Sequence, residues 1–203
     1  WARWRGRAAA CGALIVLASV LGVTLPRSPF EWDEVLFARA VEHYDAAANS
    51  PHMPGYPAFV AACRVLDLAV QDPVRAVQLA SALGAAIAVV LVFTGVRRAA
   101  GEAAGWLAAV TMSCCPCFLW YGAVGLSDAT GAALSVAVLV AVLDPRPSPS
   151  RAAAAGALAA LAVGVRTQAV YALIPTAAAA LVLWRDRRPA RVAAAAGAAV
   201  AVS

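Results

Sequence analysis

The sequence predicts an all-α fold, a polytopic transmembrane helical bundle of about six to seven spans with interfacial amphipathic helices in its first outer loop. Of the 203 residues, 63% are hydrophobic and only 13% are charged. Soluble domains are about 45–50% apolar and about 25% charged. The mean hydropathy is +0.78, and the apolar residues gather in runs that approach the ~20 residues needed to cross a bilayer.

Seven apolar runs mark the predicted spans. The fifth run is short and rich in Ala, and the last one reaches Ser203 after only twelve residues. We therefore expect residues 1–203 to be the N-terminal part of one transmembrane domain whose C-terminal remainder is absent from this sequence. The predicted spans are Ala8–Leu25, Ala76–Val96, Ala103–Trp120, Ser127–Leu143, Ala152–Val165, Ala169–Trp184 and Val192 onward.

The arginine residues set the predicted orientation of these spans. All sixteen basic residues are Arg, and most of them cluster at alternate ends of the apolar runs. Cytoplasmic loops of membrane proteins are enriched in basic residues, so we expect the N-terminus and every second connection to be cytoplasmic. The sequence thus predicts a multi-pass protein of the plasma membrane, surrounded by the lipid bilayer.

The acidic residues gather in the predicted first outer loop, residues 26–75. Seven of the eleven fall between Glu31 and Asp72. A carboxylate costs little free energy in water but about 3 kcal/mol at the bilayer centre, so we expect this extracytoplasmic loop to carry the function. Helical spacing of apolar residues predicts an amphipathic helix over Glu34–Ala48. A second, interfacial or re-entrant helix is predicted over Tyr56–Val70.

Four polar residues in or facing this loop are candidates for chemistry. Asp33 and Asp128 each precede or open a predicted helix, so each is either an N-cap or a functional carboxylate, and the two roles are compatible. Arg166 interrupts an Ala-rich apolar stretch, and it either extends to water at the interface or binds a phosphate. Because Glu34 lies beside Asp33 and all four fall on the outer side, we expect them to be able to share one cavity.

The sequence gives little support for a nucleotide-binding, serine-nucleophile, nucleic-acid-binding or metal site. The sequence has no P-loop, GxGxxG motif or Ser nucleophile elbow. The net charge of +5 does not indicate a nucleic-acid partner, because the Arg residues lie at the ends of apolar runs. His43 and His52, with the nearby carboxylates, are ligand types for a divalent metal, but no known ligand spacing appears. We predict no metal site and no certain cofactor, and a divalent metal stays open as the alternative.

Four short motifs follow one another along the chain, each beside a predicted helix. They are Trp32-Asp33-Glu34-x-x-Phe37, His52-x-Pro54-Gly55-Tyr56-Pro57, Gly125-Leu126-Ser127-Asp128 and Gly164-Val165-Arg166. Their order and spacing resemble the C-type (GT-C) polytopic membrane glycosyltransferases, in the branch of protein mannosyltransferases and lipopolysaccharide-sugar transferases.

The resemblance implies an inverting enzyme that transfers a sugar from a polyprenyl-phosphate-linked donor to a hydroxyl of a glycan, lipid or protein acceptor. It implies that Asp33 is the general base and that Glu34 orients the base or the acceptor. Arg166 would contact the donor phosphate. The substrate-binding residues implied are Asp128, Arg166, His52 and Tyr56.

Members of this family have more spans than 203 residues supply, so we expect the fragment alone to be inactive. The alternative is a non-enzymatic multi-span membrane protein, an assembly or transport subunit whose outer loop docks a partner. In that case Asp33 and Glu34 would tolerate substitution.

Overall fold

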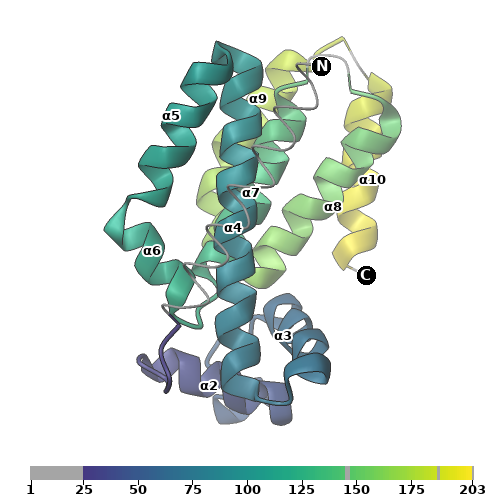
Figure 1. The fold of residues 1–203 in the computed structure, drawn as a ribbon. Coiled ribbons are helices and arrows are strands. Elements are labelled where there is room, and N and C mark those ends of the chain that lie inside the picture. The colour runs from purple at the N-terminus through teal and green to yellow at the C-terminus, as the bar shows by residue number, and fades with distance from the viewer. Residues whose placement is uncertain (1–24, 145–146, 187, 203) are drawn as a thin grey trace.

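The computed structural model describes residues 25–144, 147–186 and 188–202, which form helices and their connections (Figure 1). Within these residues there is no β-strand, and the one isolated bridge among them joins Asp45 to Ser50. The all-α prediction is confirmed for this part of the chain. The first predicted span, Ala8–Leu25, falls outside the described residues except for Leu25.

The acidic loop contains three helical elements. They are α2 (Trp32–Glu42), the short 3-10 helix η1 (Ala46–Ala48) and α3 (Pro57–Val70). The predicted helix Glu34–Ala48 is therefore wrong in its extent, whereas the predicted second helix is confirmed to within one residue. The chain leaves α2 because the Ser50 hydroxyl donates to the carbonyl oxygen of His43 over 2.6 Å and the backbones of Asp45 and Ser50 pair. These bonds fold the segment into a turn.

Helix α3 supports the C-terminal end of α2. The last carbonyl groups of a helix have no partner inside the helix. Arg64 of α3 donates hydrogen bonds to two of these carbonyl oxygens, those of Ala40 at 3.0 Å and Val41 at 2.9 Å. Phe37 of α2 packs edge-on against Phe59 of α3 with ring centroids 5.0 Å apart. The two helices thus form one layer, and its apolar core is shared with Val77, Ala80 and Val165 of the bundle.

Helix α4 (Pro73–Ala100) is the longest helix described and the centre of the bundle. Asp72 caps its first turn by accepting hydrogen bonds from two backbone N–H groups. Pro73 occupies the first helical position, where its missing N–H costs nothing. The helix ends after Arg97 and Arg98, cations that stabilise the negative end of the helix dipole.

The predicted span Ala103–Trp120 is broken. The structure has two helices here, α5 (Glu102–Ser113) and α6 (Pro116–Ala123), whose axes differ by 65°. Pro116 explains the break, because proline lacks an N–H and disfavours helical geometry in the residue before it. The bend turns α6 toward the layer formed by α2 and α3 (Figure 1).

The remaining helices begin and end close to the predicted positions. They are α7 (Asp128–Val142), α8 (Pro149–Val165), α9 (Ala169–Leu183) and α10 (Arg188–Val202). α8 and α10 lie in close contact, because a Cβ placed on Gly156 would lie 1.8 Å from the carbonyl oxygen of Ala194. Small residues of this kind let membrane helices approach each other closely.

Only some of the predicted spans form helices that are long enough to cross a membrane. Among the described helices α4 is long and apolar enough to cross a membrane, and the bent α5–α6 pair qualifies if it counts as one span. The apolar helices α7, α8 and α9 have 15, 17 and 15 residues, which is short of the ~20 required. The number of six to seven spans is therefore not confirmed.

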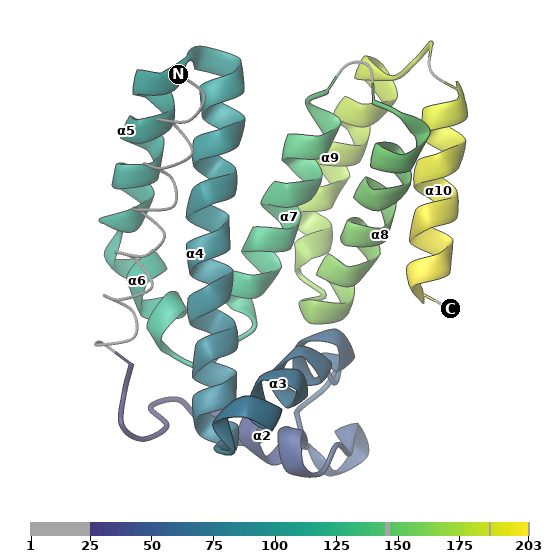
Figure 2. The ribbon, with the colours of Figure 1, turned by 45° about the vertical axis from the view of Figure 1, so that its right-hand side comes forward.

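The helices separate two chemically different ends of the bundle. The α2–α3 layer lies across one end, beside the start of α7 and the turn between α8 and α9 (Figures 1 and 2). The ends of α4, α7 and α9 and the starts of α8 and α10 lie at the other end. The acidic loop and the Asp128 and Arg166 corners are thus at one end, as the alternation of arginine residues predicts.

Candidate functional site

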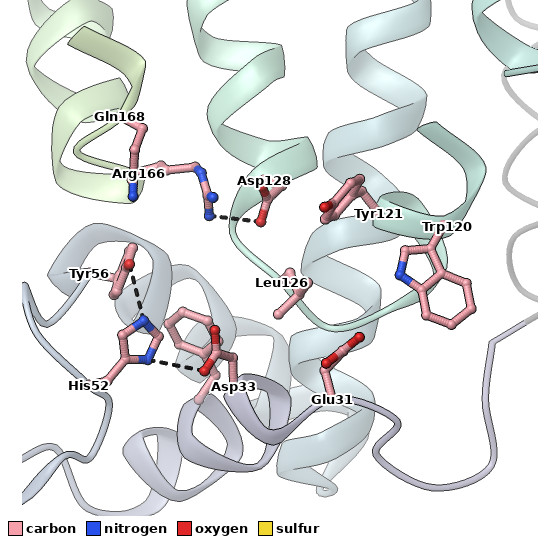
Figure 3. Close-up of a pocket in the computed structure, with 11 residues that line it drawn as sticks. Glu31, Asp33, His52, Tyr56, Trp120, Tyr121, Leu126, Asp128, Arg166 and Gln168 are labelled. Carbon is pink, nitrogen blue, oxygen red and sulfur yellow. Dashed lines mark hydrogen bonds and ion pairs between the residues drawn. The ribbon is translucent and has the colours of Figure 1, made fainter. Parts of the chain in front are cut away.

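A polar cavity of about 350 Å³ lies where the α2–α3 layer meets the ends of the bundle helices (Figure 3). Five of the six predicted site residues line it, and only Glu34 does not: the five are Asp33, His52, Tyr56, Asp128 and Arg166. The full lining set is Glu31, Asp33, Phe37, His52, Tyr56, Trp120, Tyr121, Leu126, Asp128, Arg166 and Gln168.

The first turn of α2 presents Asp33 to the cavity. The N-cap of this helix is Glu31, and no side chain caps it. Asp33 therefore does not serve as the N-cap, which was one of its two predicted roles. Its side chain is 52% exposed, and the carboxylate faces the cavity in Figure 3. A carboxylate without a capping bond in a wet cavity remains able to accept a proton from a bound hydroxyl.

Glu34, the next residue, has the opposite surroundings. It is fully buried and accepts hydrogen bonds from the backbone N–H of Phe30 at 2.8 Å, the side-chain amide of Gln78 at 2.8 Å and the backbone N–H of Gly125 at 3.2 Å. A Cβ on Gly125 would lie 2.9 Å from Glu34 Oε1, so glycine is needed for this approach. We call Phe30, Glu34, Gln78 and Gly125 the buried polar network.

His52 lies between Tyr56 and Asp33 (Figure 3). Its Nε2 is 3.2 Å from the Tyr56 hydroxyl, and its Nδ1 is 3.7 Å from Asp33 Oδ1. The Nδ1 atom is buried and has no hydrogen-bond partner within the described chain. Phe37 packs against both rings and holds them in place. A small movement of Asp33 would bring its carboxylate within hydrogen-bond distance of Nδ1.

A tight turn places Tyr56 beside His52. Gly55 has φ +93°, and the residue after it, Tyr56, has φ +46°. Gly55 N–H donates to the carbonyl oxygen of His52 over 3.0 Å and closes the turn. A Cβ on Gly55 would lie 2.6 Å from the hydroxyl oxygen of Tyr44, so both the backbone angle and the contact require glycine here. Pro57 then starts α3.

Arg166 and Asp128 form the opposite wall. Arg166 Nη1 donates to Asp128 Oδ2 over 2.7 Å and to the Ser127 hydroxyl over 3.3 Å. The N-cap of α7 is Ser127, so Asp128 is not the cap. Gly131 allows the contact, because a Cβ there would lie 3.0 Å from Arg166 Cβ. The Arg166 side chain is only 29% exposed, so it is held in a specific ion pair and does not simply extend to water.

Six cavity residues carried no site prediction from the sequence: Glu31, Phe37, Trp120, Tyr121, Leu126 and Gln168. Trp120 was the last residue of the predicted span Ala103–Trp120 and Tyr121 followed it, and the bend before α6 turns both toward the site. Phe30 packs edge-on against Trp120 with ring centroids 4.8 Å apart. The backbone of Leu126 is fixed by Ser81 of α4, whose hydroxyl donates to its carbonyl oxygen and accepts from its N–H at 2.8 Å.

The charges in the cavity act together on Tyr56. Burial is the main cause that raises the pKa of the Tyr56 phenol; Arg166 lowers it in part, and Asp33 and Asp128 raise it further. The phenol is therefore protonated at neutral pH and can donate to His52 Nε2. In the tautomer that accepts this bond at Nε2, the imidazole proton is on Nδ1, facing Asp33.

Three carboxylates and one guanidinium line the cavity. The carboxylates therefore outnumber the cationic side chains in its lining, and Arg166 is the one guanidinium there. Among the residues that the structure describes, no three His, Cys, Asp or Glu side chains are placed to hold a metal ion together.

Fold and site together define a helical protein with a polar cavity at one end of a largely apolar bundle. Residues 52–203 match the family described as dolichyl-phosphate-mannose-protein mannosyltransferase. The match covers well over half of the chain, so this protein belongs to that family of GT-C membrane glycosyltransferases. No curated protein and no solved structure matches the chain.

The match divides the site residues into two groups. His52, Tyr56, Asp128 and Arg166 lie within the matched residues, whereas Asp33 precedes them. Four of the six predicted site residues therefore fall in the part of the chain that matches the family. The prediction that Asp33 is the general base therefore depends on its position in the cavity and not on the family match.

Proposed function

We propose that this chain forms the catalytic part of a membrane glycosyltransferase that transfers a sugar from a polyprenyl-phosphate-linked donor to an acceptor hydroxyl, with inversion at the anomeric carbon. One observation supports this most strongly. A single cavity contains a half-exposed carboxylate, Asp33, and a guanidinium, Arg166. These are the two groups that such a transfer needs, in a chain of this family.

Asp33 is the proposed general base. An attacking hydroxyl is activated when a positioned side chain accepts its proton, which typically accelerates the reaction 10²–10⁴-fold. Asp33 meets the geometric requirement, because its carboxylate is exposed in the cavity and makes no helix-capping bond. The imidazole Nδ1–H of His52, 3.7 Å away, is placed to stabilise the carboxylate in the orientation that faces the acceptor.

Glu34 has a different proposed role. Its carboxyl group is buried and occupied by three donors, so it does not reach an acceptor in the cavity. It anchors the first turn of α2 to α4 and to the segment before α7. Through that anchoring it orients the neighbouring base, which is one of the two roles expected for it.

Arg166 is the proposed contact for the donor phosphate. Its pair with Asp128 uses Nη1, so the guanidinium has further N–H groups for a second partner. Guanidinium and phosphate form strong, charge-assisted hydrogen bonds. Asp128 fixes the orientation of the guanidinium before the donor arrives, which lowers the cost of ordering it on binding.

The proposed reaction forms one bond to the anomeric carbon, breaks another and moves one proton. The acceptor hydroxyl gives its proton to the Asp33 carboxylate while its oxygen forms a bond to the anomeric carbon. The bond between that carbon and the phosphate oxygen breaks, and the electron pair leaves with the polyprenyl phosphate. Arg166 stabilises the negative charge that develops on the leaving group, an effect worth roughly 10²–10³-fold for a single well-placed donor.

The membrane orientation is part of the same proposal. The arginine-rich end of the bundle faces the cytoplasm by the positive-inside rule. The cavity then opens at the extracytoplasmic face of the plasma membrane, where a lipid-linked donor has its head group in water and its chain in the bilayer. The acceptor is a hydroxyl of a glycan, lipid or protein.

An Asp33→Asn variant tests the proposal directly. The amide keeps the size of the side chain but cannot accept the proton. Membranes that contain the complete polypeptide would be supplied with radiolabelled polyprenyl-phosphate mannose, and label transferred to membrane acceptors would be counted. We expect at least a roughly hundredfold loss of transfer with unchanged amounts of protein in the membrane.

The matched control is Glu42→Gln, an exposed carboxylate at the end of the same helix and outside the cavity. It should transfer label at the wild-type rate. Full activity of Asp33→Asn would contradict the assignment of the base. The alternative of a non-enzymatic assembly or transport subunit would be favoured if neither the wild type nor any variant transfers the label.

A further inference from the structure

A second cavity, of about 820 Å³, lies at the opposite end of the bundle between α4, α7 and α8. The helices α4 and α7 touch at Gly84, where a Cβ would lie 2.7 Å from the backbone of Thr130. At Gly95 the nearest atom is the far end of a side chain, Val140 Cγ2, at 2.9 Å. From the contact at Gly84, α4 and α7 diverge toward the end of the bundle where α4 ends (Figure 2). The groove results from this divergence.

The groove is apolar along most of its length. Its larger apolar side chains come from all three helices and are those of Leu91, Val140, Leu143 and Leu158. Most of the other lining residues are alanines, which are too small to fill the space between the helices. Its volume is within the ~300–1,000 Å³ typical of sites for small ligands.

Charged groups gather where the groove reaches the end of the bundle. Arg151 Nη1 donates to Asp144 Oδ2 over 3.1 Å. Arg98 is exposed, and it forms no ion pair with any residue that the structure describes. The lining therefore contains two guanidinium groups and one carboxylate. One guanidinium stays available for an anion.

We propose that this groove binds an anionic glycerophospholipid, with one acyl chain along α4 and α8 and the phosphate at Arg98. The apolar walls match the acyl chain, and the free guanidinium matches the phosphate. Basic pockets between membrane helices bind lipid head groups in this way. The inference depends on the membrane setting of the family and not on the proposed sugar transfer, because this groove lies at the other end of the bundle from Asp33.

Native mass spectrometry of the detergent-purified chain tests the site. The probes are phosphatidylglycerol and phosphatidylcholine with identical acyl chains. The wild type should retain more phosphatidylglycerol. Arg98→Gln should reduce phosphatidylglycerol binding about fivefold, the factor that corresponds to ~1 kcal/mol for one basic residue near an anionic lipid surface. Arg188→Gln makes the same charge change on α10, outside the groove, and should bind as the wild type does.

A second variant tests the apolar part without changing charge. Ala154→Leu places a larger side chain in the groove and should reduce binding of both lipids, whereas Ala178→Leu, at an exposed position on α9, should not. Equal binding by Arg98→Gln and Arg188→Gln, or no preference for the anionic lipid, would overturn the proposal. The proposal would also be overturned if the wild type forms dimers and Ala154→Leu dissociates them, because a second copy of the chain would then occupy the groove.

Discussion

Two polar regions meet at the first turn of α2 and differ in almost every physical respect. The cavity holds Asp33 half-exposed, with the imidazole Nδ1 of His52 3.7 Å from its Oδ1. The buried polar network holds Glu34 fully buried, with three donors at 2.8–3.2 Å. The two residues are adjacent in sequence and carry the same chemical group.

The surroundings of a carboxylate, and not its residue type, decide whether it can react with a ligand or only stabilises the fold. A buried carboxyl group whose donors are all matched is costly to remove, because each donor left behind loses its partner. A carboxylate in a wet, loosely paired cavity costs little to change, and it can move toward a ligand. The first arrangement suits a fixed scaffold and the second suits a reacting group.

Glu34→Ala should produce the largest effect on stability. The change leaves the N–H groups of Phe30 and Gly125 and the amide of Gln78 without their acceptor, and each buried, unsatisfied donor costs about 1–3 kcal/mol. We expect the free energy of unfolding to fall by about 3 kcal/mol or more. Chemical denaturation of the detergent-solubilised chain, followed by circular dichroism, measures it.

Two controls sharpen this result. Glu42→Ala removes an exposed carboxylate from the same helix and should change the free energy of unfolding by less than about 0.5 kcal/mol. Asp33→Asn should likewise leave stability almost unchanged while it abolishes transfer. If Glu34→Ala proved as stable as Glu42→Ala, the difference between the two polar regions would not exist in solution.

Arg166→Gln should produce the next largest effect, on transfer. The variant keeps a hydrogen-bonding side chain but loses the positive charge, so we expect kcat/KM for transfer to fall roughly a hundredfold, about 2.7 kcal/mol of transition-state stabilisation. Arg166→Lys should recover part of this loss, because lysine keeps the charge but not the planar geometry. Transfer from radiolabelled donor measures each value.

The control for Arg166 is another guanidinium paired with an aspartate. Arg151 is bound to Asp144 at 3.1 Å, but at the other end of the bundle. Arg151→Gln should therefore leave kcat/KM for sugar transfer unchanged. A similar loss in both variants would mean that Arg166 acts through the general stability of the bundle and not through the donor.

The sequence predicted features that depend on local pattern. Apolar runs located α4 and α7 to α10 within a few residues, and the alternation of arginine residues placed Asp33, Asp128 and Arg166 at one end. It did not predict the burial of Glu34, because its partners Gln78 and Gly125 are 44 and 91 residues away in sequence. It did not predict the bend at Pro116 either, since an apolar run of sufficient length fits a straight helix equally well.

Tyr56→Phe should produce the smallest effect and tests whether Tyr56 holds His52 in place beside Asp33 in the cavity. At neutral pH the variant loses one hydrogen bond to Nε2, so we expect about 1 kcal/mol of lost stability. Burial raises the pKa of Tyr56 above its ordinary value of 10.0 in the folded chain. As the pH rises through about 10, the unfolded chain loses the phenolic proton first. The free energy of unfolding of the wild type then falls, and that of the variant has no such dependence on this group.

The difference in stability between wild type and Tyr56→Phe should therefore be full at about pH 8 and shrink above about pH 10. Thermal unfolding in detergent at a series of pH values measures it. Tyr171→Phe is the control, because Tyr171 is 75% exposed on α9 and should show no such difference. A difference that stays constant across this range would mean that Tyr56 ionises in the folded chain as readily as in the unfolded one. The hydroxyl would then be a solvated group, and His52 would have no fixed partner to orient its Nδ1 toward Asp33.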